Sequence, residues 1–408
     1  MKVFRFAWRN IWRSPRRTMI TVAAISLNVA VLIASYGLMD GMVKHLISNV
    51  TNMVTGEVQI HAPRYLVDHS MYKVVKNPTG IMERLGSRSI YGVARSYGYG
   101  LVACGNKSAG ALFWGVDPAM EKKYFDLAEH VATGRYLGSV PRKEIVVGRK
   151  LARSLNVKIG SEVVLVVQAA DGSLGNDLFT VRGILKAAGD RIDRDAAIMH
   201  CQDFEELFVS GGRIHEIALN TRGAVSLAAL EQLAAAAAPG TDVKSWRQLM
   251  PALSDMVNFF DAGMWLFGMI FFLAAALGVM NTMLMSTFER IREFGILKAI
   301  GTSPWRILGD VAAESFALSL VSTVIGGIIG IGLSLFFMHK GLDTSIFIPG
   351  DAAVSVSGIA FDPVWRATIS LKTILSPILM MWFISLIASL YPAAIAARLD
   401  PVKAMARV

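Results

Sequence analysis

Several common signatures of catalysis are absent from this sequence. No G-x-x-x-x-G-K-[ST] motif occurs in the 408 residues, so the chain has no phosphate-binding loop of its own for ATP. No pair of histidines has metal-ligand spacing, and no serine or cysteine has the flanking residues of a nucleophile elbow. The only cysteines, Cys104 and Cys201, predict two buried free thiols, although a disulfide between them stays open. Charged residues make up 18% and hydrophobic residues 53%, which excludes a soluble enzyme of ordinary composition.

Four long hydrophobic runs without charge account for this composition. Thr18–Met39, Ala262–Phe288, Ser315–Met338 and Thr373–Ala397 contain 22, 27, 24 and 25 residues. A helix needs about 20 residues to cross the hydrocarbon of a bilayer. The first run exceeds the 7–15 residues typical of a signal-peptide core, so we interpret it as an uncleaved span. The sequence therefore predicts an α-helical membrane protein with four transmembrane helices, one followed by three, and a large domain at residues 40–261.

Positive charge gathers in the short segments on one side of these spans. Residues 1–17, 289–314 and 398–408 contain 13 Lys and Arg together, whereas the loop 339–372 contains three. The positive-inside rule therefore predicts that both termini and 289–314 are cytoplasmic, and that 40–261 and 339–372 are extracytoplasmic. This distribution, rather than nucleic-acid binding, explains the net charge of +10. Within 1–17, an aromatic stripe over Phe4–Trp12 predicts an amphipathic helix, for which a plain topology anchor is the simpler interpretation.

The large domain mixes strand and helix patterns, which predicts an α+β fold. Strands are expected at Gly56–Ala62, Glu144–Gly148, Glu162–Gln168, Leu178–Ile184, His215–Asn220 and Thr241–Trp246. Helices are expected at Lys150–Asn156 and Val225–Ala238, and a turn at Asp171–Gly175. Its first and last thirds are expected to form one subdomain, with a mostly β subdomain inserted between them. Gly41–Met53 and Gln248–Asp261 are expected to be helical stalks that continue from the spans.

Two cytoplasmic segments carry a family resemblance. Phe288–Ile307 reads FERIREFGILKAIGTSPWRI, and Tyr391–Met405 reads YPAAIAARLDPVKAM. Both resemble segments of the FtsX/MacB/LolC-type ABC transporter permeases. The opening FAWRNIWRSPRRTMIT and the strand GEVQIHAP resemble the LolC/LolE branch, which releases lipoproteins. Together with the one-plus-three topology, the resemblance covers essentially the whole chain. It implies a multi-pass protein of the bacterial inner membrane with a MacB-like periplasmic domain.

The resemblance implies a permease subunit that is not itself an ATPase. Such permeases dimerise, with a second copy or a paralogue, and bind two ABC ATPase subunits that hold ATP and magnesium; this chain itself needs no cofactor. A coupling helix in the loop after the second span fits a groove of the ATPase, and the spans transmit its motion outward by mechanotransmission. A mixed-charge amphipathic helix also suits protein docking, with a helix lying on the membrane as the alternative. The resemblance assigns Glu289, Arg290, Arg292, Glu293, Gly295, Ile296, Leu297, Lys298, Ile300 and Gly301 to this coupling helix.

Dimeric relatives bind amphiphilic cargo between the first and second spans. Here the resemblance implies a cargo cavity lined by one stripe on each span: Asn28, Leu32, Tyr36 and Met39, and Phe259, Gly263, Leu266 and Ile270. The alternative is that these faces contact lipid or a partner helix. Lipoprotein or another lipidic molecule is the expected cargo, and a periplasmic acceptor protein is compatible with this role. The glycines Gly326, Gly327, Gly330 and Gly332 predict close helix packing.

Two other functions stay open at this level. The first is an FtsX-like signalling subunit that transports nothing and relays the state of the ATPase to extracytoplasmic partners. Its outer domain would usually be much smaller than 222 residues, which favours the transporter. The second is a membrane enzyme, with His61, His69 or His200 and the aspartates of Gly189–Asp195 as candidates. That last segment alternates in charge and predicts a solvated loop. Neither the cargo nor the choice between homodimer and heterodimer follows from the sequence.

Overall fold

The computed structural model describes residues 14–186, 189–343, 355–356, 359–360, 364–400, 402 and 404, in two compact units. The helical unit comprises Met1–Val43, Val257–Ile346 and Val364–Val408. The sheet unit comprises Lys44–Met256 and Phe347–Pro363. The predicted amphipathic helix at Phe4–Trp12 lies outside the described residues.

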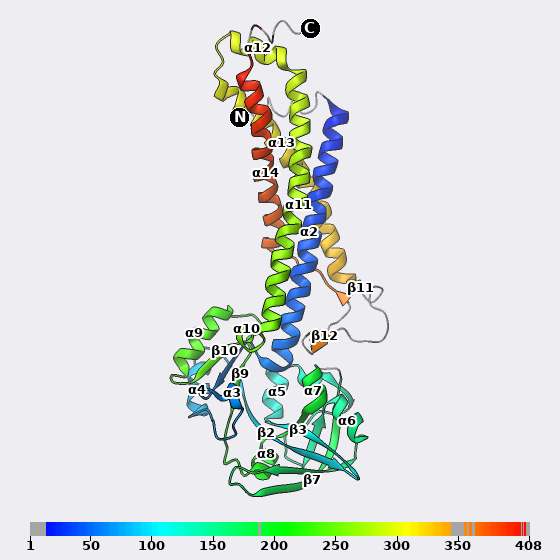
Figure 1. The fold of residues 1–408 in the computed structure, drawn as a ribbon, viewed down its shortest axis with the longest axis vertical. Helices are drawn as coiled ribbons and strands as arrows, with labels where there is room; N and C mark the ends of the chain where they lie inside the picture. Colours follow the sequence, from blue (N-terminus) through cyan, green and yellow to red (C-terminus); the bar gives the residue numbers. More distant parts are fainter. Residues whose placement is uncertain are drawn as a thin grey trace. The chain divides into compact units, whose positions relative to one another are not determined.

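Long helices make up the helical unit (Figure 1). They are α2 (Pro15–Val50), α11 (Pro251–Glu289), α12 (Ile291–Ala299), α13 (Pro304–Lys340) and α14 (Leu371–Arg398). A π-helical turn, Thr51–Thr55, extends α2, and the short strands β11 (Leu342–Asp343) and β14 (Val364–Trp365) pair after the end of α13. Among the described residues, α2 with its extension, α11, α13 and α14 are long and apolar enough to span a membrane, which confirms the four predicted transmembrane helices. Where the hydrocarbon begins on each helix stays a prediction.

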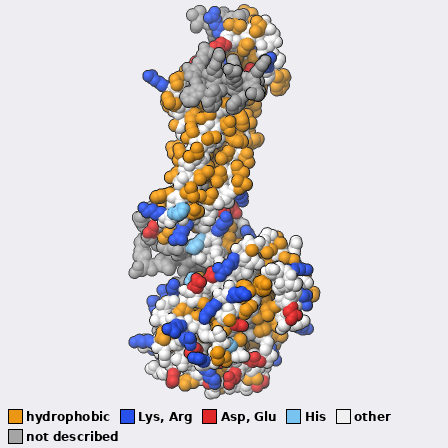
Figure 2. Space-filling view, turned by 180° about the vertical axis from the view of Figure 1, so that it is seen from behind, with side chains coloured by type: hydrophobic (Ala, Val, Ile, Leu, Met, Phe, Trp, Pro, Cys, Tyr) orange, Lys and Arg blue, Asp and Glu red, His pale blue; other side chains and the backbone are white. Residues whose placement is uncertain are grey.

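Hydroxyl groups form hydrogen bonds between these helices, and a glycine allows two of them to approach closely. Figure 2 shows the middle of this unit covered by hydrophobic side chains. Inside it, the hydroxyls of Thr21 and Thr282 lie 2.8 Å apart, and those of Ser315 and Ser385 lie 3.0 Å apart. A Cβ added at Gly326 would lie 2.5 Å from the carbonyl oxygen of Ser26, so a larger residue there would push α2 and α13 apart. The close-packing role predicted for this glycine cluster therefore applies at Gly326.

The sheet unit contains one ten-stranded mixed sheet. Its strand order is β10-β1-β9-β2-β3-β8-β5-β7-β4, and β6 pairs with both β2 and β7. The strands are β1 (Val58–His61), β2 (Gly92–Cys104), β3 (Lys107–Val116), β4 (Val131–Gly134), β5 (Glu144–Val147), β6 (Glu162–Gln168), β7 (Leu174–Leu185), β8 (Ala196–His200), β9 (Glu216–Leu219) and β10 (Asp242–Ser245). The helices are α3 (Tyr65–Asp68), α4 (Pro78–Gly86), α5 (Pro118–Tyr124), α6 (Arg149–Leu155), α7 (Asp190–Asp195), α8 (Cys201–Phe208), α9 (Leu227–Ala237) and α10 (Trp246–Leu249), with a 3-10 turn at Leu127–His130.

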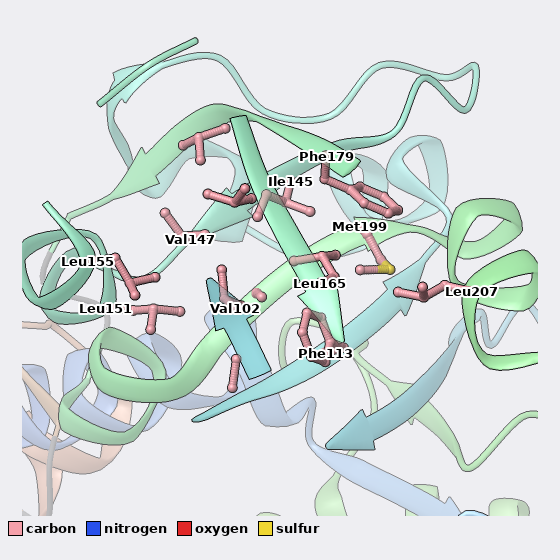
Figure 3. Close-up of a cluster of buried hydrophobic side chains, with 14 of the residues drawn as sticks. Val102, Phe113, Ile145, Val147, Leu151, Leu155, Leu165, Phe179, Met199 and Leu207 are labelled. Atoms are coloured by element: carbon pink, nitrogen blue, oxygen red, sulfur yellow. The ribbon is translucent and has the colours of Figure 1, made fainter. Parts of the chain in front are cut away.

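The sheet carries separate hydrophobic cores. One lies under β1, β9, α4 and α9, and contains Ile60, Leu85, Ile217 and Leu230. In another, Phe113, Ile145, Leu165, Phe179 and Met199 converge from five strands (Figure 3). In β6, alternate residues enter this second core, because side chains of a strand point alternately to its two faces. The two expected subdomains are therefore two cores on a single sheet, and the α+β fold is confirmed.

Most of the predicted strands are confirmed, but the hairpin β2–β3 and strands β4 and β8 were not predicted. Strand β2 is long enough to join the cores, because Gly92–Arg95 pair with β9 and Gly100–Ala103 pair with β6. The prediction of a solvated loop at Gly189–Asp195 was wrong. The helix α7 forms there, and its Asp193 is buried with a carboxylate 3.6 Å from Arg149.

Candidate functional site

The loop between α11 and α13 folds as a separate short helix. Helix α11 ends at Glu289, Arg290 leaves the helical conformation, and α12 begins at Ile291. Gly301 adopts φ +92°, a left-handed conformation that glycine tolerates at a helix end. The amide of Thr302 there donates to the carbonyl of Leu297 at 3.0 Å. The helix predicted over Glu289–Gly301 is therefore shorter, and Glu289 belongs to the preceding helix.

A buried ion pair anchors one face of this loop. The Arg290 guanidinium donates to the Glu314 carboxylate of α13 at 2.8 Å and to Glu293 at 3.1 Å. The side chains of Arg290 and Glu314 are each 8% exposed, and Ser286 also contacts Glu314, at 3.3 Å. Arg290 also lies over the Phe294 ring at 5.1 Å. Because buried charges need partners, Arg290 and Glu314 hold each other in place and fix α12 against α13.

Hydrophobic packing and a lysine attach the same face to α14. Phe294 is buried against Ile307 and Val311 of α13 and against Ala393 and Ala396 of α14, and Leu297 packs partly buried beside them. The Lys298 ammonium donates to the carbonyls of Ala397 and Leu399, at 3.0 and 2.5 Å. Those carbonyls lie at the end of α14, where they have no partner within the helix. Phe294, Leu297 and Lys298 of the predicted coupling helix thus serve largely to hold it to the bundle.

The opposite face of α12 is exposed and largely apolar. Ile296 is 46% exposed and Ile300 is 74% exposed, and Trp305 at the start of α13 is 78% exposed. Arg292 is exposed beside them, and the half-exposed Glu289 pairs with Arg17 at 2.9 Å. We call Arg292, Ile296, Ile300 and Trp305 the docking face. A rigidly attached patch of this composition suits an aromatic and arginine-containing protein interface.

The two predicted cargo stripes do not face one another. Leu32 is fully buried in the bundle, and the Asn28 amide donates to the carbonyl of Phe271 on α11 at 2.8 Å. Tyr36 likewise points to α11, with its hydroxyl 3.5 Å from the Met264 carbonyl. The stripe on α2 therefore packs against α11, and the assignment of Leu32 to an open lining needs correction. Helical spacing identifies a face but not what that face touches.

The stripe on α11 has the opposite environment. Phe259, Leu266 and Ile270 are 73%, 51% and 57% exposed, and a Cβ added at Gly263 would meet no neighbour within 4 Å. Met39, the last member of the α2 stripe, is half-buried. The residues left available to a partner helix, lipid or cargo are therefore those of α11.

The residues considered for an enzyme serve the fold in the sheet unit. His61 is buried, with its ring nitrogens 2.9 Å from Gln59 Oε1 and 3.1 Å from the carbonyl of His215. His200 accepts from the amide of Gln202 at 3.2 Å and so caps α8. Across the described residues, no group of three His, Cys, Asp or Glu side chains could hold a metal ion. Both cysteines are free and partly buried, and burial raises the pKa of the Cys201 thiol.

Comparison with known proteins identifies the class of this molecule. Residues 18–238 match the family model of the MacB-like periplasmic core domain, and residues 265–401 match that of the FtsX-like permease C-terminal region. The chain therefore belongs to the FtsX- and MacB-like ABC transporter permeases, as the sequence motifs predicted. Members of this family pair with ABC ATPase subunits.

Relatives resemble the chain over its full length or over part of it. An ABC transporter permease of Methanocaldococcus jannaschii is 22% identical over 99% of this chain and 97% of its own length. The lipoprotein-releasing system transmembrane protein LolC of Neisseria meningitidis is 21% identical over 95% of this chain and 93% of its own. The macrolide export ATP-binding/permease protein MacB of Salmonella paratyphi A is 34% identical, over 35% of this chain and 19% of its own.

Proposed function

We propose that this chain is the permease subunit of a transporter whose ATP is hydrolysed by a separate ATPase subunit bound at the docking face. The observation that carries the proposal is the division of α12 into two faces. One is fixed to α13 and α14 by Arg290–Glu314 and Phe294, and the other exposes Ile296 and Ile300. A residue that is both exposed and rigidly held can transmit a push to the helices behind it.

Mechanotransmission would carry that push along the long helices. Helices α2 and α11 contain 36 and 39 residues, so they are about 54 and 58 Å long at 1.5 Å per residue. Because hydrocarbon is only about 30 Å thick, both helices must extend beyond it. A movement imposed at one end of such a helix would reach groups outside the membrane. This length supports the proposed role of Gly41–Met53 and Gln248–Asp261 as stalks.

The proposed cargo is an amphiphile, with lipoprotein the leading candidate, taken from the outer leaflet of the inner membrane. Likeness to LolC over nearly the whole chain supports lipoprotein. The exposed residues Phe259, Leu266 and Ile270 offer an apolar surface where a second permease subunit and cargo would meet. Photo-crosslinking amino acids at Leu266 and Ile270 should capture lipoprotein in an ATP-dependent way. Capture of bulk phospholipid alone, unchanged by ATP, would contradict this cargo route.

The proposed topology places both termini and residues 289–314 in the cytoplasm. It rests on the charge asymmetry of the loops, and it must hold if α12 is to meet an ATPase. Single cysteines at Thr302 and Val140, in a background without Cys104 and Cys201, test it in intact cells. An impermeant thiol reagent should label position 140 and not position 302. Labelling at 302 would contradict the proposal.

Substitutions on the two faces of α12 test the ATPase site. Ile296→Asp and Ile300→Asp place a charge in the proposed interface, so we expect normal membrane abundance with loss of the co-purifying ATPase and of transport. Val140→Asp makes the same kind of change at a residue of the sheet unit that is 61% exposed, and should keep the ATPase. Phe294→Asp places a charge in the packed face of α12 and should instead lower the amount of the protein in the membrane. An Ile300→Asp protein with its ATPase and activity intact would overturn the docking site.

Binding of the ATPase without transport would indicate the signalling function. If the wild-type complex hydrolyses ATP but releases no lipoprotein or other amphiphile from proteoliposomes, the FtsX-like relay becomes the better account. The docking variants separate this case from a failure of docking, because they abolish ATPase binding under either function.

A further inference from the structure

A cavity of about 780 Å³ lies within the sheet unit and takes no part in the function proposed above. The π-helical end of α2, strands β1 to β3, helices α3 and α7 and residues 248–251 contribute its walls. Volumes between about 300 and 1,000 Å³ are typical of sites for small ligands. The cavity is therefore large enough for a small molecule that carries an alkyl chain.

The walls of this cavity are mainly apolar and aromatic. Met53 and Leu112 line it together with Trp114, which is only 5% exposed. Tyr65 is held between two rings, with its centroid 5.3 Å from that of His61 and 5.6 Å from that of His215. Burial raises the pKa of Tyr65, so its phenol stays neutral. A surface of this kind favours the apolar part of a ligand.

The carboxylate of Glu216 in the wall is bonded to groups of the protein. The Glu216 carboxylate accepts from the Arg95 guanidinium at 3.0 Å and from the Tyr97 hydroxyl at 3.1 Å. Arg95 also donates to a second carboxylate, that of Glu121, at 2.6 Å. One guanidinium shared by two carboxylates leaves no cation in this part of the wall for a ligand, which favours an apolar body rather than an anionic head group there.

Open polar groups occur on the lining residues of α3 and α7. Arg191 is exposed, and its guanidinium has no ion-pair or hydrogen-bond partner among the residues that the structure describes. Burial, assisted by the positive charge of Arg191, lowers the pKa of His69, which also lines the cavity. Lys244 adds a second cation, paired with Asp242 at 3.3 Å, whereas Asp195 is the half-exposed acid of the lining. Arg191 is thus a donor that a ligand anion could use.

We propose that this cavity binds an amphiphile whose aliphatic chain lies among Met53, Leu112 and Trp114 and whose anionic head group pairs with Arg191. The proposal is independent of ATPase docking, because every residue that it uses belongs to the sheet unit. A free anionic amphiphile and the acidic head group of a lipid share this chemistry, and the probe below represents both.

Protection of a cysteine from alkylation tests the site in the full chain. The protein, with Cys104 and Cys201 replaced by serine, would carry a single cysteine at Leu112 or at Leu249 in nanodiscs of zwitterionic phospholipid. We expect dodecyl phosphate to slow the reaction of N-ethylmaleimide at both positions and not at Val140→Cys. Inorganic phosphate should not protect, because it has no chain. An unchanged rate at both lining positions, or equal slowing at position 140, would overturn the site.

Matched probes and variants test the head group separately. Dodecyltrimethylammonium has the same chain and the opposite charge, and should need at least about ten times the concentration for equal protection, since a charged hydrogen bond contributes about that factor. Arg191→Gln should raise the half-protecting concentration of dodecyl phosphate about tenfold, whereas Arg194→Gln on the same helix should not. Nanodiscs of anionic phospholipid should protect without any added probe only if the lipid itself is the source. Equal protection by both head groups and in Arg191→Gln would overturn the anionic specificity.

Discussion

In the part of the chain that the structure describes, each unit contains a buried arginine bonded to glutamate, and the two arginines differ in how completely their partners are enclosed. In the sheet unit, Arg95 is fully buried and bonds to Glu121, Glu216 and the carbonyl of Val54. In the helical unit, Arg290 bonds to the buried Glu314 and to Glu293, whose side chain is 42% exposed. Arg95 with its two glutamates joins β2, α5 and β9, and so holds the domain together. Arg290 with its two glutamates holds only a loop helix to the bundle. Buried charge therefore stabilises architecture in one unit and orients an attachment in the other.

Removing Arg95 should have the largest effect. Arg95→Met leaves Glu121 and Glu216 buried without their cation, which costs about 3–5 kcal/mol of unfolding free energy. We expect low membrane abundance and a clearly lower thermal unfolding midpoint of the sheet unit. Arg222→Met breaks the more exposed pair with Asp126, 2.7 Å apart, and should cost less than about 1 kcal/mol. Equal stability of the two variants would mean that the enclosed network does not hold the sheet unit together.

Removing Arg290 should leave the molecule folded but should loosen the attachment of α12 to the bundle. Arg290→Met breaks the bonds to Glu314 and Glu293, whereas the hydrophobic contacts of Phe294 remain. Amide hydrogen exchange across residues 291–300 should rise by about tenfold or more, since a charged hydrogen bond contributes at least 1.4 kcal/mol. Arg292→Met, on the exposed face, should leave exchange unchanged and weaken ATPase binding. Amide exchange at the wild-type rate in Arg290→Met would mean that the ion pair does not hold α12 to the bundle.

A smaller effect is expected from protonation near the Arg95 network. His215 accepts from the amide of Tyr97 at 2.9 Å and donates to the carbonyl of Met71 at 3.0 Å, so both ring nitrogens are used by the neutral form. Burial lowers the pKa of His215, and the unfolded chain therefore binds a proton more readily. Stability should fall as the pH drops below about 6.5, by about 1.4 kcal/mol for each unit by which the pKa is lowered. His215→Gln should flatten this dependence between pH 7 and 5, measured by thermal unfolding. An unchanged slope would exclude His215 as its source.

The sequence predicted those parts of the fold whose signal is local. Uninterrupted apolar runs predicted the four spans, and alternation predicted β6 at its observed bounds. The hairpin β2–β3 was missed because glycines interrupt its pattern. A Cβ at Gly98 would lie 2.3 Å from Phe208, and one at Gly115 would lie 2.6 Å from Phe204, so these glycines make room for α8. Such a requirement comes from a helix far along the chain, and no local pattern reveals it.

The sequence predicted where the candidate site lies along the chain, but not which of its residues face the bundle and which are exposed. The motif after α11 identified the loop, yet it assigned Arg290 and Leu297 to docking. Their partners are Glu314 on α13 and a cluster that includes Ala393 and Ala396 on α14, all distant in sequence. The cavity of the sheet unit was missed as well. Arg191, which lines that cavity, belongs to a segment whose alternating charges predicted a solvated loop.

Site-specific photo-crosslinking at Ile300 tests the central claim most directly, because this side chain is 74% exposed on the proposed docking face. A benzophenone amino acid at position 300, irradiated in cells, should join the chain to one ABC-type ATPase subunit identified by mass spectrometry. The same amino acid at Val140 should not do so, since that residue lies in the sheet unit. Adducts to lipid alone at position 300, or an ATPase adduct of equal yield at position 140, would contradict the assignment of this face to the ATPase.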